Sequence, residues 1–179
     1  MIICASLVFL MTPGLAFFYG GLGRRKNVIN TMMMCVIPIA VASVMWMICG
    51  YSLSFGGDGS LIGNFSHLFF NGVSETASTR GLEIPDALFA AFQMMFPIIT
   101  VAILTGAAAG RMRFTPLIIF IIFWLLLVYF PFAHMVWDEG LLAQWGTIDF
   151  AGGDVVHITS GVSGLVWHWY LENVEIITV

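Results

Sequence analysis

Long apolar runs alternate with short polar stretches along the 179 residues of this chain. An apolar run of about 20 residues, folded as a helix, is long enough to cross the hydrocarbon core of a bilayer. The first run is too long and too rich in glycine for a signal peptide, and no small-residue cleavage site follows it. The pattern therefore predicts five transmembrane helices, at residues 2–23, 28–55, 87–110, 115–137 and 153–171, with a polar, Gly-rich connection at 56–86.

The amino-acid composition is strongly apolar. Hydrophobic residues make up 60% of the chain and charged residues only 9%, and the mean hydropathy is +0.98. Soluble domains carry about 25% charged residues, so these values predict an all-α integral membrane protein. The net charge of −4 and the lack of a basic patch argue against binding to nucleic acid. Cys4, Cys35 and Cys49 lie inside predicted helices without metal-type spacing, so ordinary apolar packing explains them.

The basic residues predict the orientation of the chain in the membrane. Short connections that are rich in Lys and Arg stay on the cytoplasmic side. With five spans, the connections after the first and third helices lie on the same side, which is therefore cytoplasmic, and the N-terminus is predicted to lie outside. These two connections hold all of the basic residues except Arg80, namely Arg24, Arg25, Lys26, Arg111 and Arg113.

The stretch "DFAGGDVVHITSGVSGLV" at 149–166 places charged and titratable groups at the start of the fifth predicted helix. Asp149 fits a helix cap, because aspartate is favoured at helix N-termini, and also fits an anion that shapes an entrance for a cation. Asp154 lies three residues before His157, so it either pairs with that histidine or faces the outer water. His157 is either a buried residue that satisfies a carbonyl or a functional group within the membrane.

Aromatic residues in the third and fourth predicted helices also have two interpretations. Trp137 ends the fourth predicted helix, where tryptophan commonly anchors a helix at the interface, and its face is also a good surface for a small cation. Phe92 and Phe96 lie four residues apart, which stacks them on one helix face. They are either packing residues or a gate, and the gate requires that the third helix line a pathway.

Five strings, in this order along the chain, carry a resemblance to a known family: "MTPGLAFFYGGLGRRKN", "GYSLSFG", "AAFQMMF", "FAHMVW" and "DFAGGDVVHITSGVSGLV". The chain resembles the N-terminal half of the ammonium transporter (Amt/Mep/Rh) family, collinearly as far as about Val166. The resemblance implies a transporter of ammonium or methylammonium in the plasma membrane, not an enzyme, without a cofactor and working as a homotrimer. It also implies two five-helix halves of inverted topology and a final helix, so that this chain is the first repeat.

The resemblance implies roles for individual residues. Trp137 matches the tryptophan of the outer recruitment site, and Phe96 matches one of two gate phenylalanines, with Phe92 one turn away. Asp149 matches a buried aspartate that supports that site. His157 matches the first of two histidines that face each other across a hydrophobic lumen. The implied mechanism is recruitment of ammonium, loss of a proton and passage of ammonia.

The sequence after Val166, "WHWYLENVEIITV", departs from the family pattern, which divides the chain into residues 1–166 and a divergent tail at 167–179. The second half of the family is absent, and with it the facing histidine, because His168 lies on the same helix as His157. We expect one wall of a pore, in a truncated or interrupted family member that conducts only if another polypeptide or self-association supplies the other wall. Two alternatives are a non-conducting ammonium-sensing or interaction subunit and an intramembrane metalloenzyme with His134, His157, Asp149 and Asp154 as ligands.

Overall fold

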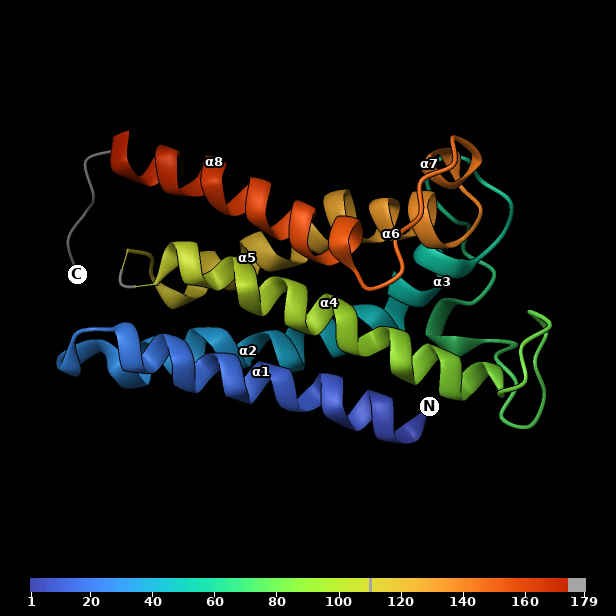
Figure 1. Ribbon diagram of the computed structural model, residues 1–179, viewed down its shortest axis with the longest axis horizontal. Helices are drawn as coiled ribbons and strands as arrows, with labels where there is room; N and C mark the ends of the chain where they lie inside the picture. Colours follow the sequence, from blue (N-terminus) through green and yellow to red (C-terminus); the bar gives the residue numbers. More distant parts are fainter. Residues whose placement is uncertain (110, 174–179) are drawn as a thin grey trace.

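The computed structural model describes residues 1–109 and 111–173 and is an all-helical bundle (Figure 1). The long helical segments are α1 (Ile2–Leu22); α2 (Val28–Met45), which continues through a π turn (Trp46–Gly50) into α3 (Tyr51–Phe55); α4 (Asp86–Ala108); α5 (Phe114–Trp124), which continues through a π turn (Leu125–Tyr129) into α6 (Phe130–Trp137); and a π turn (Gly153–Ile158) that leads into α8 (Thr159–Asn173). The shorter elements are 3-10 turns at Arg25–Asn27 and Leu68–Phe70, and α7 (Leu141–Gln144).

The structure has a helical segment at each of the five predicted positions, and the ends of these segments agree with the prediction to within two residues. Position 110 and the last part of the tail, 174–179, lie outside the described residues. Within the described part of the chain, four segments are long and apolar enough to cross a membrane: Ile2–Leu22, Arg25–Phe55, Asp86–Ala108 and Phe114–Gln144. The fifth, 153–173, is more polar because it carries Asp154, His157 and several hydroxyl groups.

The helices pack around a core that is rich in aromatic residues. The α1, α2 and α4 helices pack against one another, α5 packs on α2, α6 on α3, and α8 on α4. The fully buried Trp46 packs beside Phe130, with ring centroids 5.9 Å apart, and its indole N–H donates to the carbonyl of Ala90 at 3.1 Å. This contact fixes α4 against the α2 segment. The long face of α4 that carries the candidate site is thereby held in place.

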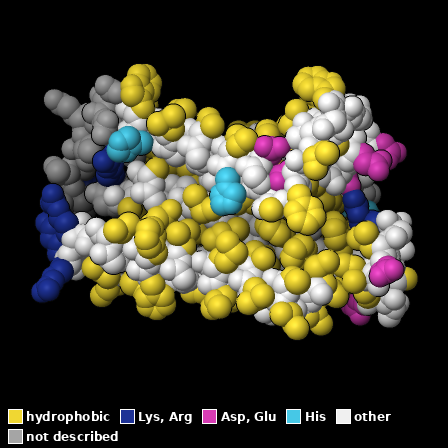
Figure 2. Space-filling model, viewed as in Figure 1, with side chains coloured by type: hydrophobic (Ala, Val, Ile, Leu, Met, Phe, Trp, Pro, Cys, Tyr) yellow, Lys and Arg dark blue, Asp and Glu magenta, His cyan; other side chains and the backbone are white. Residues whose placement is uncertain are grey.

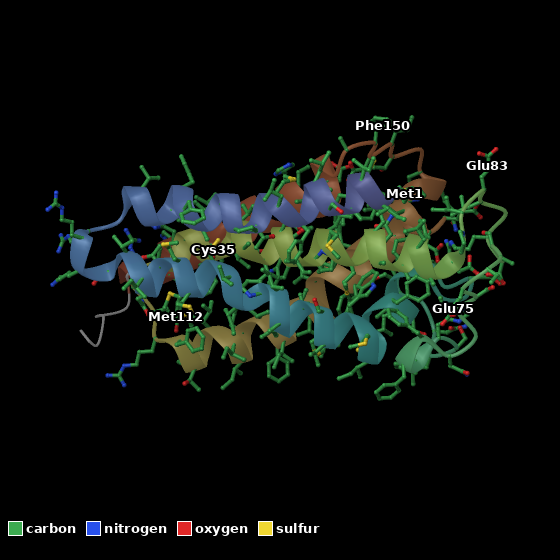
Figure 3. The ribbon with its side chains drawn as sticks, turned by 90° about the horizontal axis from the view of Figure 1, so that it is seen from below. Met1, Cys35, Glu75, Glu83, Met112 and Phe150 are labelled. Atoms are coloured by element: carbon green, nitrogen blue, oxygen red, sulfur yellow. The ribbon has the colours of Figure 1, made fainter. Side chains whose placement is uncertain are left out.

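Two glycines allow this close packing. A Cβ at Gly50 would lie 2.6 Å from the ring of Phe130, and a Cβ at Gly106 would lie 2.6 Å from the ring of Tyr19. Small residues permit helices in a membrane to approach closely. Gly106, in the stretch "GAAAG", is such a residue. Cys35 is buried between the helices (Figure 3), in agreement with packing, whereas the exposed Cys4 does not pack within the described chain.

Proline widens one of the helices. Pro131 is the second residue of α6, which follows the π turn Leu125–Tyr129 without a break. Proline has no N–H, and its ring crowds the carbonyl four residues earlier, so a helix that continues past it must loosen its hydrogen bonding. The wider turn supplies this room and sets the direction of α6, which ends at Trp137.

Charged side chains lie at the two ends of the bundle. Lys and Arg gather at the end where α1 turns into α2, Asp and Glu gather toward the opposite end, and hydrophobic side chains cover the surface between them (Figure 2). Large apolar side chains on α1 and α8 are exposed, for example Phe17 at 69% and Leu165 at 70%. An apolar surface between two charged ends is the pattern of a helical bundle that spans a bilayer.

Candidate functional site

Four parts of the chain meet around a cavity of about 300 Å³ at the acidic end of the bundle. One face of α4 supplies Phe89, Phe92, Gln93 and Phe96, which recur at helical spacing so that they line the same side. The remaining lining comes from Phe55 at the end of α3, Trp137 at the end of α6 and the connection 149–152. The cavity is therefore mainly aromatic.

The aromatic rings form a connected wall. Phe92 and Phe96 lie edge to face with centroids 5.0 Å apart and planes at 84°, which confirms that they stack on one face of α4. Phe96 makes a similar contact with Trp137, at 5.6 Å and 67°. Edge-to-face pairs are favourable arrangements for aromatic rings. The contacts hold the half-buried indole of Trp137 against α4, beside the cavity.

Asp149 organises the start of the fifth helix. Its Oδ1 accepts a hydrogen bond from the N–H of Gly153 at 2.7 Å, and its Oδ2 accepts bonds from Asp154 and Val155 at 3.0 and 2.9 Å. Gly152 occupies the N-cap position with φ of +81°, which glycine adopts without strain. The prediction that Asp149 caps this helix is confirmed in this form. Because the carboxylate accepts hydrogen bonds from backbone N–H groups, Asp149 shapes the cavity by fixing the backbone at the start of this helix.

His157 faces outward from the bundle. Its side chain is exposed, and its imidazole makes no hydrogen bond within the described part of the chain. It shares a face of the helix with Gly161 and Leu165, which are also exposed, whereas the hydroxyls of Thr159 and Ser160 bond to carbonyls of their own helix at 2.5 and 2.6 Å. The interpretation of His157 as a buried residue that satisfies a carbonyl is wrong.

Asp154 and the divergent tail are placed differently from His157. Asp154 is half-buried and forms no ion pair with His157 among the described residues. In the tail, α8 continues past Val166, and Trp167 is buried against Phe120 with ring centroids 4.2 Å apart. His168 contacts Arg111 in the connection between α4 and α5. These contacts anchor α8 at the basic end of the bundle.

His134 is a buried histidine whose two ring nitrogens are both engaged. Its Nδ1 lies 3.1 Å from the carbonyl oxygen of Ser54 and 3.4 Å from Oδ2 of Asp138, and its Nε2 lies 2.5 Å from the carbonyl oxygen of Gly59. Neither nitrogen is available to a metal. Within residues 1–109 and 111–173, no group of three or more His, Cys, Asp or Glu side chains could hold a metal ion. The four proposed metal ligands are therefore not brought together.

A larger polar cavity of about 860 Å³ lies next to the aromatic one, and Phe55, Phe89 and Trp137 line both. Arg80 lines this second cavity and forms an ion pair with Asp138. Its guanidinium also donates to the carbonyl of Phe55 at 2.8 Å and lies 5.2 and 5.3 Å from the ring centroids of Phe55 and Phe89. Arg80 thus ties the connection 56–86 to the aromatic wall.

The sequence pattern of a known family covers almost the whole chain. A sequence model described as Ammonium Transporter Family matches residues 1–175. The chain belongs to the ammonium transporter family. It is therefore a multi-pass membrane protein from a family of transporters, not of enzymes, and the matched region extends beyond Val166.

Relatives of this chain include proteins of known structure. The ammonium transporter of Bacillus subtilis (strain 168) is 48% identical over 166 residues, which cover 93% of this chain and 41% of the relative. The crystal structure of Candida albicans Mep2 matches with a TM-score of 0.85 and 33% identity, covering 94% of this chain and 37% of that one. A solved structure described as "Sensor Amt Protein" matches with a TM-score of 0.79 and 30% identity, covering 89% and 40%. The chain thus spans about two fifths of the length of these relatives.

Sequence reasoning missed two polar side chains at the cavities of this chain. Arg80 was noted only because it is the basic residue outside the two basic connections. That isolated position among acidic residues is itself a signal that it has a specific partner. Gln93 lies in an otherwise apolar stretch of α4, four residues after Phe89 and three before Phe96. A lone amide at helical spacing among phenylalanines could have identified it, because polar groups within a membrane span are usually kept for a task.

Proposed function

We propose that this chain forms one wall of a pathway that carries ammonium or methylammonium across the plasma membrane. The observation that supports the proposal most strongly is the position of the aromatic cavity. It lies where α6 and the start of the fifth helix meet α4, and the fifth helix carries His157 further along on its exposed face. Membership of the ammonium transporter family supports the same substrate.

In this proposal the aromatic cavity recruits the cation. The face of Trp137 attracts ammonium electrostatically, at about 0.5 to 2 kcal/mol depending on desolvation. Asp149 keeps the connection 149–152 in place, and Phe96, supported by Phe92, closes the pathway below the cavity. Acidic side chains at this end raise the local concentration of cations before recruitment.

His157 handles the proton in the proposed mechanism. A dry lumen strongly penalises a bare charge, so potassium, which cannot lose its charge, is excluded. Ammonium can release a proton, and the ammonia that remains passes an apolar channel. A neutral imidazole can accept a hydrogen bond or relay that proton. The apolar face that His157 shares with Gly161 and Leu165 suits such a lumen.

The proposed pathway requires a second wall. The exposed apolar face of α8 would be covered by a second five-helix half of inverted topology, and complete subunits would assemble as homotrimers. The basic connections would lie in the cytoplasm and the N-terminus outside, because Lys and Arg gather at one end of the bundle. The cavity would then open to the outside.

Uptake of radiolabelled methylammonium tests the proposal. The whole chain is produced in cells without ammonium transporters, alone or together with the part of the Bacillus subtilis relative that it does not cover. Copurification of the two polypeptides verifies assembly. We expect uptake only by the assembled pair, inhibited by ammonium and not by potassium. An assembled pair without uptake would refute transport, and uptake by this chain alone would show that self-association supplies the second wall.

A non-conducting ammonium sensor is the second candidate function. The likeness to the structure described as "Sensor Amt Protein" favours it. A sensor would keep the aromatic cavity and use occupancy to change its contacts with a partner. Methylammonium binding to the assembled pair, without uptake and with a changed affinity between the two polypeptides, would support the sensor over the transporter.

A further inference from the structure

The side-chain oxygen of Gln93 is buried without a hydrogen-bond partner. Among the described residues, only this Oε1 and the hydroxyl of Thr12 are buried side-chain groups in that state. Gln93 lines the aromatic cavity together with Phe92, Phe96 and Trp137, whereas Thr12 does not. Gln93 is therefore one of the residues that line the cavity that we propose as the recruitment site.

An unpaired buried amide oxygen is costly. Leaving such a group without a partner costs about 1 to 3 kcal/mol, so buried polar groups in proteins are almost always paired. An apolar side chain of similar length would pack at this position of α4 without that cost. The neighbouring phenylalanine rings offer no strong donor. The pairing partner of Gln93 is then expected to come from a molecule that enters the cavity.

A cation with N–H groups supplies what the cavity lacks. Aromatic faces attract a positive charge but accept directed hydrogen bonds only weakly. An amide oxygen accepts a strong bond from a charged N–H donor. We propose that Oε1 of Gln93 accepts a hydrogen bond from ammonium or methylammonium in the aromatic cavity. This inference rests on the proposed function and adds a polar acceptor to its aromatic recruitment site.

The substitution Gln93→Met tests the inference, because it keeps the length of the side chain and removes the acceptor. Thr12→Val is the matched control, since it removes the other unpaired buried group outside the cavity. In the assembled pair, we expect Gln93→Met to raise the apparent KM for methylammonium about tenfold, with the maximal rate within twofold. Gln93→Glu keeps an acceptor at this position, so we expect it to retain the low KM of the unsubstituted pair. Thr12→Val should leave KM unchanged.

Stability distinguishes ligand recognition from a structural role. We expect the unfolding temperature of the purified chain in lipid nanodiscs to stay the same or rise in Gln93→Met, as in Thr12→Val, because an unpaired group is lost. An unchanged KM, or a lower unfolding temperature in Gln93→Met, overturns the inference and leaves the proposed transport intact. If the unsubstituted pair does not transport, the proposed function fails. The inference about Gln93 is then tested by methylammonium binding to the chain. A rise in unfolding temperature with methylammonium that Gln93→Met abolishes then supports the inference. An equal rise in both proteins, or none in either, overturns it.

Discussion

The indole N–H of Trp137 donates a hydrogen bond to the backbone carbonyl of Asp149 at 3.2 Å. This bond joins the end of α6 to the connection that precedes the fifth helix. The side chain of Asp149 then accepts three backbone N–H bonds from that helix. The aromatic cavity and the start of the helix that carries His157 are therefore parts of one hydrogen-bonded unit.

Asp149 is predicted to stabilise this unit mainly through the three hydrogen bonds that its carboxylate accepts from backbone N–H groups. Asp149→Ala removes all three bonds and should lower the free energy of unfolding by about 2 kcal/mol. Asp149→Asn keeps one acceptor oxygen and should cost about half as much. Denaturant unfolding of the purified chain in nanodiscs, followed by hydrogen exchange at 150–157, measures both effects. Equal stability of the three proteins would show that the caps contribute little and that charge is the main role of Asp149.

His157 is predicted to act in conduction without contributing to stability. Because its imidazole is exposed and makes no hydrogen bond within the described chain, His157→Ala should leave the unfolding temperature within about 2 °C of the unsubstituted chain. Uptake of methylammonium by the assembled pair should be lost. Thr159→Val is the contrasting control, because it removes a hydroxyl that is buried within the bundle and not an exposed group. Unchanged uptake in His157→Ala would exclude the proposed proton step.

Arg80 is predicted to fix the aromatic wall through two groups at once. It pairs with Asp138 and also donates to the carbonyl of Phe55. Arg80→Lys cannot reproduce this forked contact, because an ammonium group lacks the planar set of donors. We expect faster hydrogen exchange at 78–89 and 134–139 in Arg80→Lys, with no change in α1. Arg25→Lys, in an exposed connection at the other end, is the matched control and should exchange like the unsubstituted chain.

The coupling between Arg80 and Asp138 can be measured directly. A double-mutant cycle with Arg80→Gln and Asp138→Asn should give an interaction of about 1 kcal/mol, because the two side chains are partly exposed. Additive effects of the two substitutions would show that the guanidinium acts mainly through Phe55 and Phe89.

The helices could be predicted from the sequence because apolar runs of membrane length leave few alternatives. The cap at Asp149 and the stacking of Phe92 on Phe96 were also predictable, since both depend on local spacing along one helix. The orientation of His157 was not, because its exposed face depends on which neighbours cover the helix. The contacts of Arg80 and His134 could not be predicted, for a related reason. Their partners, such as Phe55 and Ser54, are distant in sequence and are brought near only by the fold.

Gly50 is predicted to tolerate alanine poorly, whereas Gly21 is predicted to accept it. A Cβ at Gly50 would lie 2.6 Å from the ring of Phe130, which is fully buried and cannot move aside, whereas a Cβ at Gly21 meets nothing within 4 Å. Overpacking of this kind costs about 1 to 3 kcal/mol, so Gly50→Ala should lower the free energy of unfolding by that amount. Gly21→Ala should leave it unchanged or raise it by up to about 1 kcal/mol, because alanine favours helix. Because Phe130 begins the helix that ends at Trp137, Gly50→Ala should also weaken methylammonium uptake by the assembled pair. Equal stability of the two alanine variants would show that α2 and α6 can separate without loss, and that their close contact does not position the aromatic cavity.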